Sequence, residues 1–161
     1  MKFLYLTIFF LCSSIFSQNK AYPYLNSELN YNERITDLMS RMTLFEKACQ
    51  MNQFVGLEHM KKAEKDLSPE DMKKSDAQGF YKGVFSDDVK QMIINGQIGS
   101  FLPVITAEEA NYLQQLANKS KLKIPLLIGI DAIHGNALYR GATVYPSPIT
   151  IASTWDENNA Y

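Results

Sequence analysis

Cysteine is scarce in this sequence, and charge of either sign is not in excess. Of 161 residues only 2 are Cys, while 16 Lys and Arg face 17 Asp and Glu, for a net charge of -1. So few cysteines exclude a disulfide scaffold. The balanced charge argues against a nucleic-acid-binding protein, which usually has a clear basic excess. The 8 glycines and 6 prolines exclude collagen, and the 46% of hydrophobic residues is typical of a globular protein.

A hydrophobic run long enough to cross a membrane is also absent. The apolar stretch at residues 3–11 follows Lys2 and precedes several small serines. A spanning helix needs ~20 apolar residues, whereas a cationic start, a short apolar run and small residues are typical of a secretory signal peptide. We predict a signal peptide at residues 1–17, no membrane span, and export to the periplasm or the extracellular space. The alternative is a buried first strand or helix.

Behind that segment, the pattern predicts a lead-in followed by two helices. Residues 18–30 are polar with scattered aromatics, which predicts an extended lead-in. Apolar residues at helical spacing predict a first helical face of Ile35, Leu38, Met39 and Met42. A second helix from Leu44 to about Asn52, opened by the capping box Thr43-x-x-Glu46, is expected to bury Leu44, Ala48 and Met51. Cys49 is expected to be a small buried core residue.

The rest of the chain predicts an α/β fold. Residues 57–88 mix lysines with acidic residues, which favours a solvated insertion, although Ser68-Pro69 and Gly79 could bound a short helix. A helix capped by Ser86 and stopped by Gly96 follows. Short apolar runs at 98–104 and 124–130 predict parallel strands, the second buried on both faces. Between them, the capping box Thr106-x-x-Glu109 predicts a helix, which completes a βαβ unit.

The chemistry of such a fold gathers beyond the carboxyl ends of its strands, and here that place is residues 131–136. Asp131 directly follows the apolar strand, and a carboxylate there can accept hydrogen bonds from ligand hydroxyls. The alternative is that Asp131 caps the next turn and that His134 is a hydrogen-bonded, partly buried histidine. The D-x-x-H spacing could also suggest a metal site, but two ligands are weak grounds for one. Trp155 could stack on a sugar, although its place at a helix start favours core packing.

Four segments resemble glycoside hydrolase family 3, the β-glucosidase group. Residues 37–47 (DLMSRMTLFEK) and 123–135 (KIPLLIGIDAIHG) are similar to the family's D-L-L-S-R-M-T-L-E-E-K and K-I-P-L-L-I-G-I-D-A-I-H-G. Residues 141–146 (GATVYP) and 152–156 (ASTWD) are similar to G-A-T-x-F-P and A-A-T-W-D. The order of the four segments is also that of the family. The sequence departs from the usual pattern at Phe45 and at 145–148, where Y-P-S-P replaces F-P-H-N.

The resemblance implies a (β/α)8 TIM-like barrel and retaining hydrolysis of terminal non-reducing β-D-glucosyl residues. In the family, the aspartate of the I-D-A-I-H-G segment binds hydroxyls of the cleaved sugar, and Asp131 matches it. His134 and Gly135 match the motif as residues that shape the site. The D-A-I-H-G form favours the glucosidase branch over the N-acetylhexosaminidases, which have a D-x-E-G-G type sequence. A β-glucoside or oligosaccharide substrate is implied, with no cofactor and no metal.

The resemblance also predicts that the chain is an N-terminal portion of such an enzyme. A complete barrel needs ~250 residues, and the capping box Thr154-x-x-Glu157 announces a helix just before the sequence ends at Tyr161. We therefore expect residues 31–161 to be the first part of an incomplete barrel domain. The nucleophile and the acid/base are expected downstream, so no catalytic residue is assigned here. The alternatives are a non-catalytic exported carbohydrate-binding module and a different barrel hydrolase or isomerase.

Overall fold

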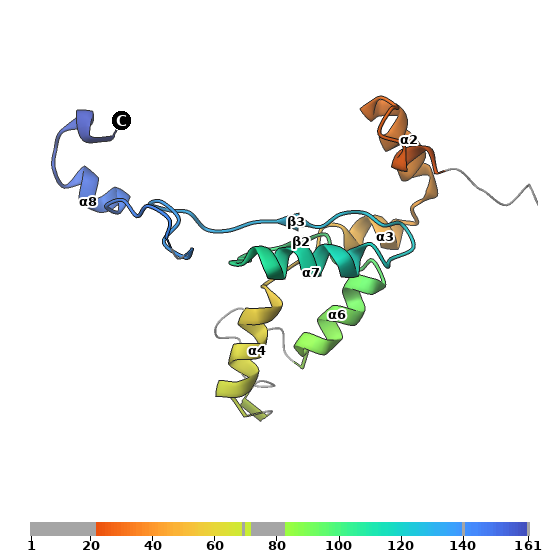
Figure 1. Cartoon of the computed structure of the whole chain (residues 1–161), viewed down its shortest axis with the longest axis horizontal. Helices are drawn as coiled ribbons and strands as arrows, with labels where there is room; N and C mark the ends of the chain where they lie inside the picture. Colours follow the sequence, from red (N-terminus) through yellow and green to blue (C-terminus); the bar gives the residue numbers. More distant parts are fainter. Residues whose placement is uncertain (1–21, 69, 72–82, 140, 161) are drawn as a thin grey trace, which may run out of the picture. The chain divides into compact units, whose positions relative to one another are not determined.

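The computed structural model describes residues 22–68, 70–71, 83–139 and 141–160. The predicted signal peptide lies outside these residues. The chain divides into two compact units, Met1–Thr43 and Leu44–Tyr161, and Figure 1 follows the elements along both. No helix in the described part of the chain is long and apolar enough to cross a membrane.

The described part of the first unit is a 3-10 helix, η2 (Pro23–Leu25), and the helix α2 (Tyr31–Arg41). The predicted first helix is thus confirmed, while part of the predicted lead-in forms η2 and packs on α2. The Arg41 guanidinium donates two hydrogen bonds of 2.9 Å to Asp37, and Asp37 also accepts the backbone N–H of Tyr24 at 3.2 Å. The bond to Arg41 holds the pKa of Asp37 below its ordinary value. These contacts fix η2 against α2.

The second unit is built on a parallel sheet in the order β1-β2-β3. Its strands are β1 (Gln53–Phe54), β2 (Ser100–Phe101) and β3 (Leu127–Ile128). The structure confirms the two predicted strands, although both are shorter than the apolar runs that contain them. The sequence analysis missed β1, which pairs with β2 in the register Gln53 to Ser100. Strands that are neighbours along the chain are therefore also neighbours in the sheet.

Three helices cover one face of this sheet: α4 (Leu57–Asp66), α6 (Ser86–Ile94) and α7 (Ala107–Ala117). Phe54 and Phe101, which are register partners, belong to the same buried cluster as apolar residues of all three helices. On the opposite face, Leu127 is 74% exposed. The prediction that its strand is buried on both faces is wrong, because the described helices pack on only one of them.

The prediction of a solvated insertion at 57–88 is wrong for its first third. There α4 buries Leu57, Met60 and Ala63, which recur every three residues along one helical face and enter the core. The lysines between these residues are exposed on the other side of the helix. Their high density had favoured the prediction of a solvated segment over that of a buried helical face. Ser68 does cap a turn, since its Oγ accepts the N–H of Asp71 at 3.1 Å. The predicted stop at Gly79 lies outside the described residues.

The short helix α3 (Leu44–Cys49) also differs from its prediction. Leu44, Ala48 and Met51 are exposed, whereas Cys49 is buried and free as expected. The helix α6 ends where the sequence predicted, at Gly96. This glycine adopts a φ of +71°, and the N–H of Gln97 donates to the carbonyl of Met92 at 2.9 Å. This pattern is a Schellman helix stop, which favours glycine.

The last described elements are α8 (Pro148–Ala152) and the 3-10 helix η4 (Glu157–Ala160). The prediction of a helix capped by Thr154 is wrong, because the Thr154 hydroxyl donates back to the carbonyl of Ile151 at 2.8 Å. Instead, a carboxylate oxygen of Asp156 accepts the N–H of Asn158 at 3.0 Å. Core packing of Trp155 is also wrong for this structure, since its side chain is 95% exposed.

Candidate functional site at the carboxyl edge of the sheet

Backbone hydrogen bonds join the chain segments that leave the carboxyl ends of the three strands. The N–H of Gly56, after β1, donates to the carbonyl of Pro103, after β2, at 3.2 Å. The N–H of Val104 donates to the carbonyl of Gly129, after β3, at 3.0 Å. This edge is where α/β proteins place their ligands, and the three loops form one connected rim there.

Asp131 lies two residues beyond Gly129, and it is exposed. Among the described residues, no hydrogen bond joins the Asp131 carboxylate to the following turn, so the structure does not support a capping role. An exposed carboxylate that follows a buried strand can accept hydroxyl hydrogen bonds from a ligand. Asp131 thus lies just beyond the carboxyl end of β3, and its contact with a ligand stays a prediction.

His134 ties the loop after Asp131 to a distant segment. Its Nδ1 lies 2.8 Å from the carbonyl oxygen of Tyr145, and the N–H of Tyr145 donates to the His134 carbonyl at 2.7 Å. A carbonyl can only accept, so Nδ1 carries the proton of this bond. The imidazole is thus held by the backbone of Tyr145, the first residue of the segment 145–148 that departs from the family pattern. In that segment, Ser147 caps α8 and Pro148 occupies its first turn.

Gly135 is required by the close approach of the same two segments. It adopts a φ of +80°, and a Cβ there would lie 2.2 Å from the carbonyl oxygen of Thr143. Any larger residue would force the two segments apart. Next to it, the side-chain oxygen of Asn136 is buried without a hydrogen-bond partner among the described residues. His134 and Gly135 therefore fix the shape of the loop that follows Asp131.

A buried carboxylate that the sequence analysis misassigned lies in the same rim. Glu109 is only 5% exposed, and its backbone N–H bonds to the Thr106 hydroxyl as the capping box predicts. Its side chain does not return to Thr106, however, but accepts the N–H of Glu58 at 2.9 Å, at the start of α4. Gly56 leaves the α4 N-terminus without a side-chain cap of its own. Glu109 supplies that cap from another helix.

The environment of Glu109 raises the pKa of its carboxyl. Burial is the largest cause, because desolvation disfavours the charged form. Hydrogen bonds from the amides of Glu58 and Leu57 oppose it, the charge of Glu58 adds to it, and the charge of Lys61 opposes it. The Glu109 proton is therefore bound more tightly in the folded protein than in the unfolded chain.

A second glutamate makes a similar connection between α4 and α6. Glu64 accepts the Ser86 hydroxyl at 2.9 Å and also the Ser86 backbone N–H. Ser86 is therefore the first residue of α6 and a buried donor, not the helix cap that the sequence predicted. The Asp88 carboxylate caps this helix by accepting the N–H of Phe85 at 2.9 Å. Asp87 and Asp88 lie in its first turn, where the helix dipole favours acidic residues.

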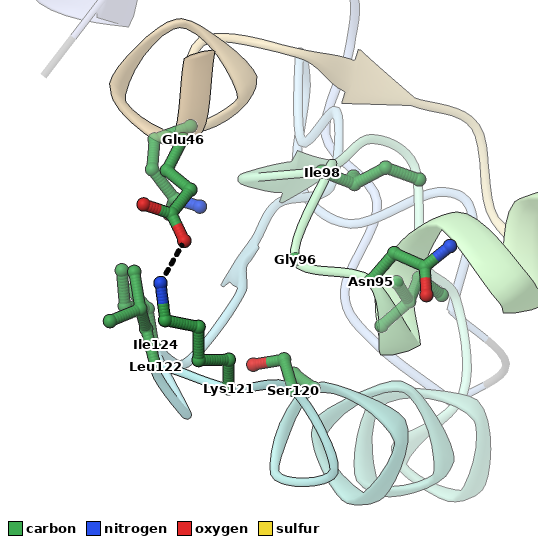
Figure 2. A pocket seen from close by; sticks show the side chains of 11 residues that line it. Glu46, Asn95, Gly96, Ile98, Ser120, Lys121, Leu122 and Ile124 are labelled. Atoms are coloured by element: carbon green, nitrogen blue, oxygen red, sulfur yellow. Dashed lines mark hydrogen bonds and ion pairs between the residues drawn. The ribbon is translucent and has the colours of Figure 1, made fainter. Parts of the chain in front are cut away.

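The opposite, amino edge of the sheet carries a narrow pocket (Figure 2). It lies between α3, the ends of α6 and α7, and the segment that leads into β3. Lys121 crosses its mouth and pairs with Glu46 at 2.9 Å. Parallel α/β sheets rarely bind ligands at this edge, where such contacts serve stability. Neither here nor elsewhere among the described residues do three His, Cys, Asp or Glu side chains converge as a metal site.

Comparison with known proteins identifies the family. Over 123 residues the chain is 26% identical to a protein named periplasmic beta-glucosidase from Salmonella typhimurium, and the match covers 76% of this chain. The chain spans only 12% of that relative's length. Residues 43–161 match the pattern of the glycosyl hydrolase family 3 N terminal domain, which covers the sheet, its helices and the Asp131 loop. The chain therefore belongs to glycoside hydrolase family 3, as the four sequence segments had predicted.

Proposed function

We propose that this chain forms the sugar-binding first part of a β-glucosidase that hydrolyses terminal non-reducing β-D-glucosyl residues with retention. Membership of a glycoside hydrolase family supports carbohydrate hydrolysis in general. The relative named as a beta-glucosidase supports the choice of substrate. The observation that carries the proposal is the exposed Asp131 carboxylate at the carboxyl edge of the parallel sheet, next to a loop that is held rigidly by His134 and Gly135.

The fold supports a barrel as the larger structure to which residues 31–161 contribute. The strand order β1-β2-β3 follows the sequence, and the described helices pack on one face of the sheet, as in the wall of a (β/α)8 barrel. In such a barrel the other face, which carries the exposed Leu127, forms the interior. Asp131 would then stand at the top of the barrel, among the loops that bind substrate.

In the proposed reaction, Asp131 binds the sugar and other residues carry out the bond cleavage. A carboxylate accepts hydrogen bonds from two neighbouring hydroxyls and so fixes the position and orientation of the ring. His134 and Gly135 keep the loop in the shape that presents Asp131. Retaining hydrolysis needs a nucleophile and an acid/base about 5–5.5 Å apart. We assign these two carboxylates to residues outside this chain, so the chain by itself is expected to be inactive on an aryl β-glucoside.

We further propose that the protein is exported, with residues 1–17 as the signal peptide. The order of a cationic start, a short apolar run and small residues supports this proposal. The Salmonella relative is named as a periplasmic enzyme, which agrees with the proposed export.

The substitution Asp131→Asn tests the proposed role in the protein expressed from its complete reading frame. Replacing the charged acceptor by an amide is expected to lower kcat/KM for an aryl β-D-glucoside by about 100-fold, which corresponds to the loss of charge-assisted hydrogen bonds. Asp66→Asn, at the exposed end of α4, is the matched control and is expected to leave kcat/KM within about 2-fold. Equal activities of the two variants would contradict the proposal. A rise in Tm with glucose but no turnover would favour a carbohydrate-binding module instead.

A further inference from the structure

Glu109 is the best-buried carboxylate of the described residues, and the proposed reaction gives it no role. It is 5% exposed, lies in the first turn of α7 and reaches across to the first turn of α4. Its contact to the N–H of Glu58 joins residues 51 positions apart in the sequence. A buried carboxylate is costly unless it is hydrogen-bonded, and Glu109 meets this requirement through the backbone of α4.

The contacts of Glu109 lead along the rim to Asp131. A Cβ on Gly56 would lie 2.8 Å from both Glu109 Oε1 and the Pro103 carbonyl oxygen, so the carboxylate packs directly on the Gly56 backbone. Gly56 bonds to Pro103, and the next residue, Val104, bonds to Gly129. Asp131 follows two residues later. Glu109 thus holds the first of three consecutive loops that end at the proposed sugar contact.

We propose that Glu109 is a positioning residue, which sets the place of Asp131 through the hydrogen-bonded rim formed by Gly56, Pro103, Val104 and Gly129. The inference rests on the proposed role of Asp131 in sugar binding. By capping α4 from α7, Glu109 fixes the start of α4 and, with it, the loop after β1. The neighbouring loops are bonded to that loop in turn, so a shift at α4 moves the whole rim. Glu58 and Lys61 are the charged groups that act on Glu109 from α4.

Glu64 offers a matched control, because it caps another helix in the same manner. Its carboxylate holds Ser86 at the start of α6, and among the described residues no backbone hydrogen bond joins Ser86 to the rim. The experiment compares Glu109→Ala and Glu64→Ala in the protein expressed from its complete reading frame. For each variant, KM for an aryl β-D-glucoside, kcat, the inhibition constant of glucose and Tm are measured. Both substitutions remove a carboxylate that accepts a backbone N–H in the first turn of a helix, so both are expected to lower Tm.

Only Glu109→Ala is expected to raise KM and the inhibition constant of glucose, by about 10-fold, because displaced binding groups lose affinity steeply with distance. Glu64→Ala should leave both constants within about 2-fold. Glu109→Gln keeps an oxygen that can accept the Glu58 N–H, and it is expected to restore both constants to nearly the wild-type values. Equal effects of Glu109→Ala and Glu64→Ala on glucose inhibition would overturn the inference.

Two further variants keep the test decisive. If Glu109→Ala does not fold, Glu109→Asp replaces it, since the shorter side chain keeps the charge but cannot reach the Glu58 amide. A rise of about 5-fold in the glucose inhibition constant supports the inference, and a constant within about 1.5-fold overturns it. Asp131→Asn is measured in parallel. If that variant leaves glucose inhibition unchanged, the proposed function fails; if it weakens inhibition and the Glu109 variants do not, only the positioning role fails.

Discussion

The two edges of the sheet are built in different ways. At the carboxyl edge, loops are joined to each other by backbone hydrogen bonds, and a buried carboxylate, Glu109, holds them from below while Asp131 remains exposed. At the amino edge, helix ends close over apolar side chains, and the one ion pair that Figure 2 draws, Lys121 with Glu46, lies at the mouth of a narrow pocket. Within the described residues, the first edge presents an exposed carboxylate next to hydrogen-bonded loops, whereas the charged pair drawn at the second edge is already joined in an ion pair.

This difference supports the proposal that sugar binding belongs to one edge of the sheet and stability to the other. A ligand site needs an unsatisfied polar group whose position is fixed by its neighbours. Among the described residues the carboxyl edge meets both conditions, because the loops next to Asp131 are bonded to one another and none of their hydrogen bonds uses the Asp131 carboxylate. Substitutions at the amino edge should therefore change stability, and those at the carboxyl edge should change sugar binding more than stability.

The largest effect on stability is expected from Gly99→Ala at the amino edge. A Cβ at this position would lie 2.0 Å from the carbonyl oxygen of Gln50, which is backbone and cannot rotate away. We expect the free energy of unfolding to fall by about 3 kcal/mol or more, which denaturant unfolding measures. Gly96→Ala is the control: it has room for a Cβ, with Ser120 Cβ at 3.8 Å, but strains a φ of +71°. That change should cost about 1 kcal/mol, and an equal loss in both variants would show that the packing at Gly99 is not as tight as described.

A smaller effect is expected from the pH dependence that Glu109 gives to stability. The folded protein raises the pKa of this carboxyl above its ordinary value of 4.5, mainly because the group is buried. A carboxyl with a raised pKa contributes stability below pH 4.5, and that contribution is lost as the pH rises through the folded pKa. The difference in the free energy of unfolding between the wild type and Glu109→Gln should therefore shift against the wild type over this range. A difference independent of pH, measured by denaturant unfolding, would contradict the burial of the carboxyl.

The smallest effect is expected from Lys121→Ala at the amino edge. Its ion pair with Glu46 is 2.9 Å long, but the lysine side chain is mostly exposed. Exposed pairs of this kind contribute about 0.5 kcal/mol and weaken with salt. Thermal unfolding at low and high ionic strength measures this contribution, and Lys121→Met, which keeps the apolar stem, is the control. A loss above about 2 kcal/mol would mean that the pair closes the pocket more firmly than an exposed ion pair does.

Local patterns predicted much of this fold. The apolar runs that contain β2 and β3, the helices that became α2, α6 and α7, the stop at Gly96 and the burial of Cys49 all follow from signals within a few residues of each other. All three strands are only two residues long, but β2 and β3 lie within longer apolar runs, whereas β1 (Gln53–Phe54) has no such run around it and was therefore missed. The helix α4 was missed because dense charge hid an apolar face that recurs every third residue.

In the candidate site, too, local sequence patterns predicted some features and tertiary contacts determined others. The place of Asp131 just after β3 could be predicted from the apolar strand before it, because that signal is local in the sequence, while its role in sugar binding stays a prediction. The true partner of Glu109 could not, because the capping box with Thr106 satisfied the local pattern while the side chain bonds to Glu58 in another helix. Tertiary contacts of this kind override local hydrogen-bonding rules, and only the structure shows them.

A crystal structure of the protein from its complete reading frame, with β-D-glucose bound, tests the central claim most directly. The account predicts that glucose lies at the carboxyl edge of the sheet, with two of its hydroxyls about 2.7 Å from the Asp131 carboxylate oxygens. The loop around His134 and Gly135 should keep the conformation described here. Glucose bound elsewhere, with Asp131 turned away from it, would contradict the assignment of this edge as the sugar site.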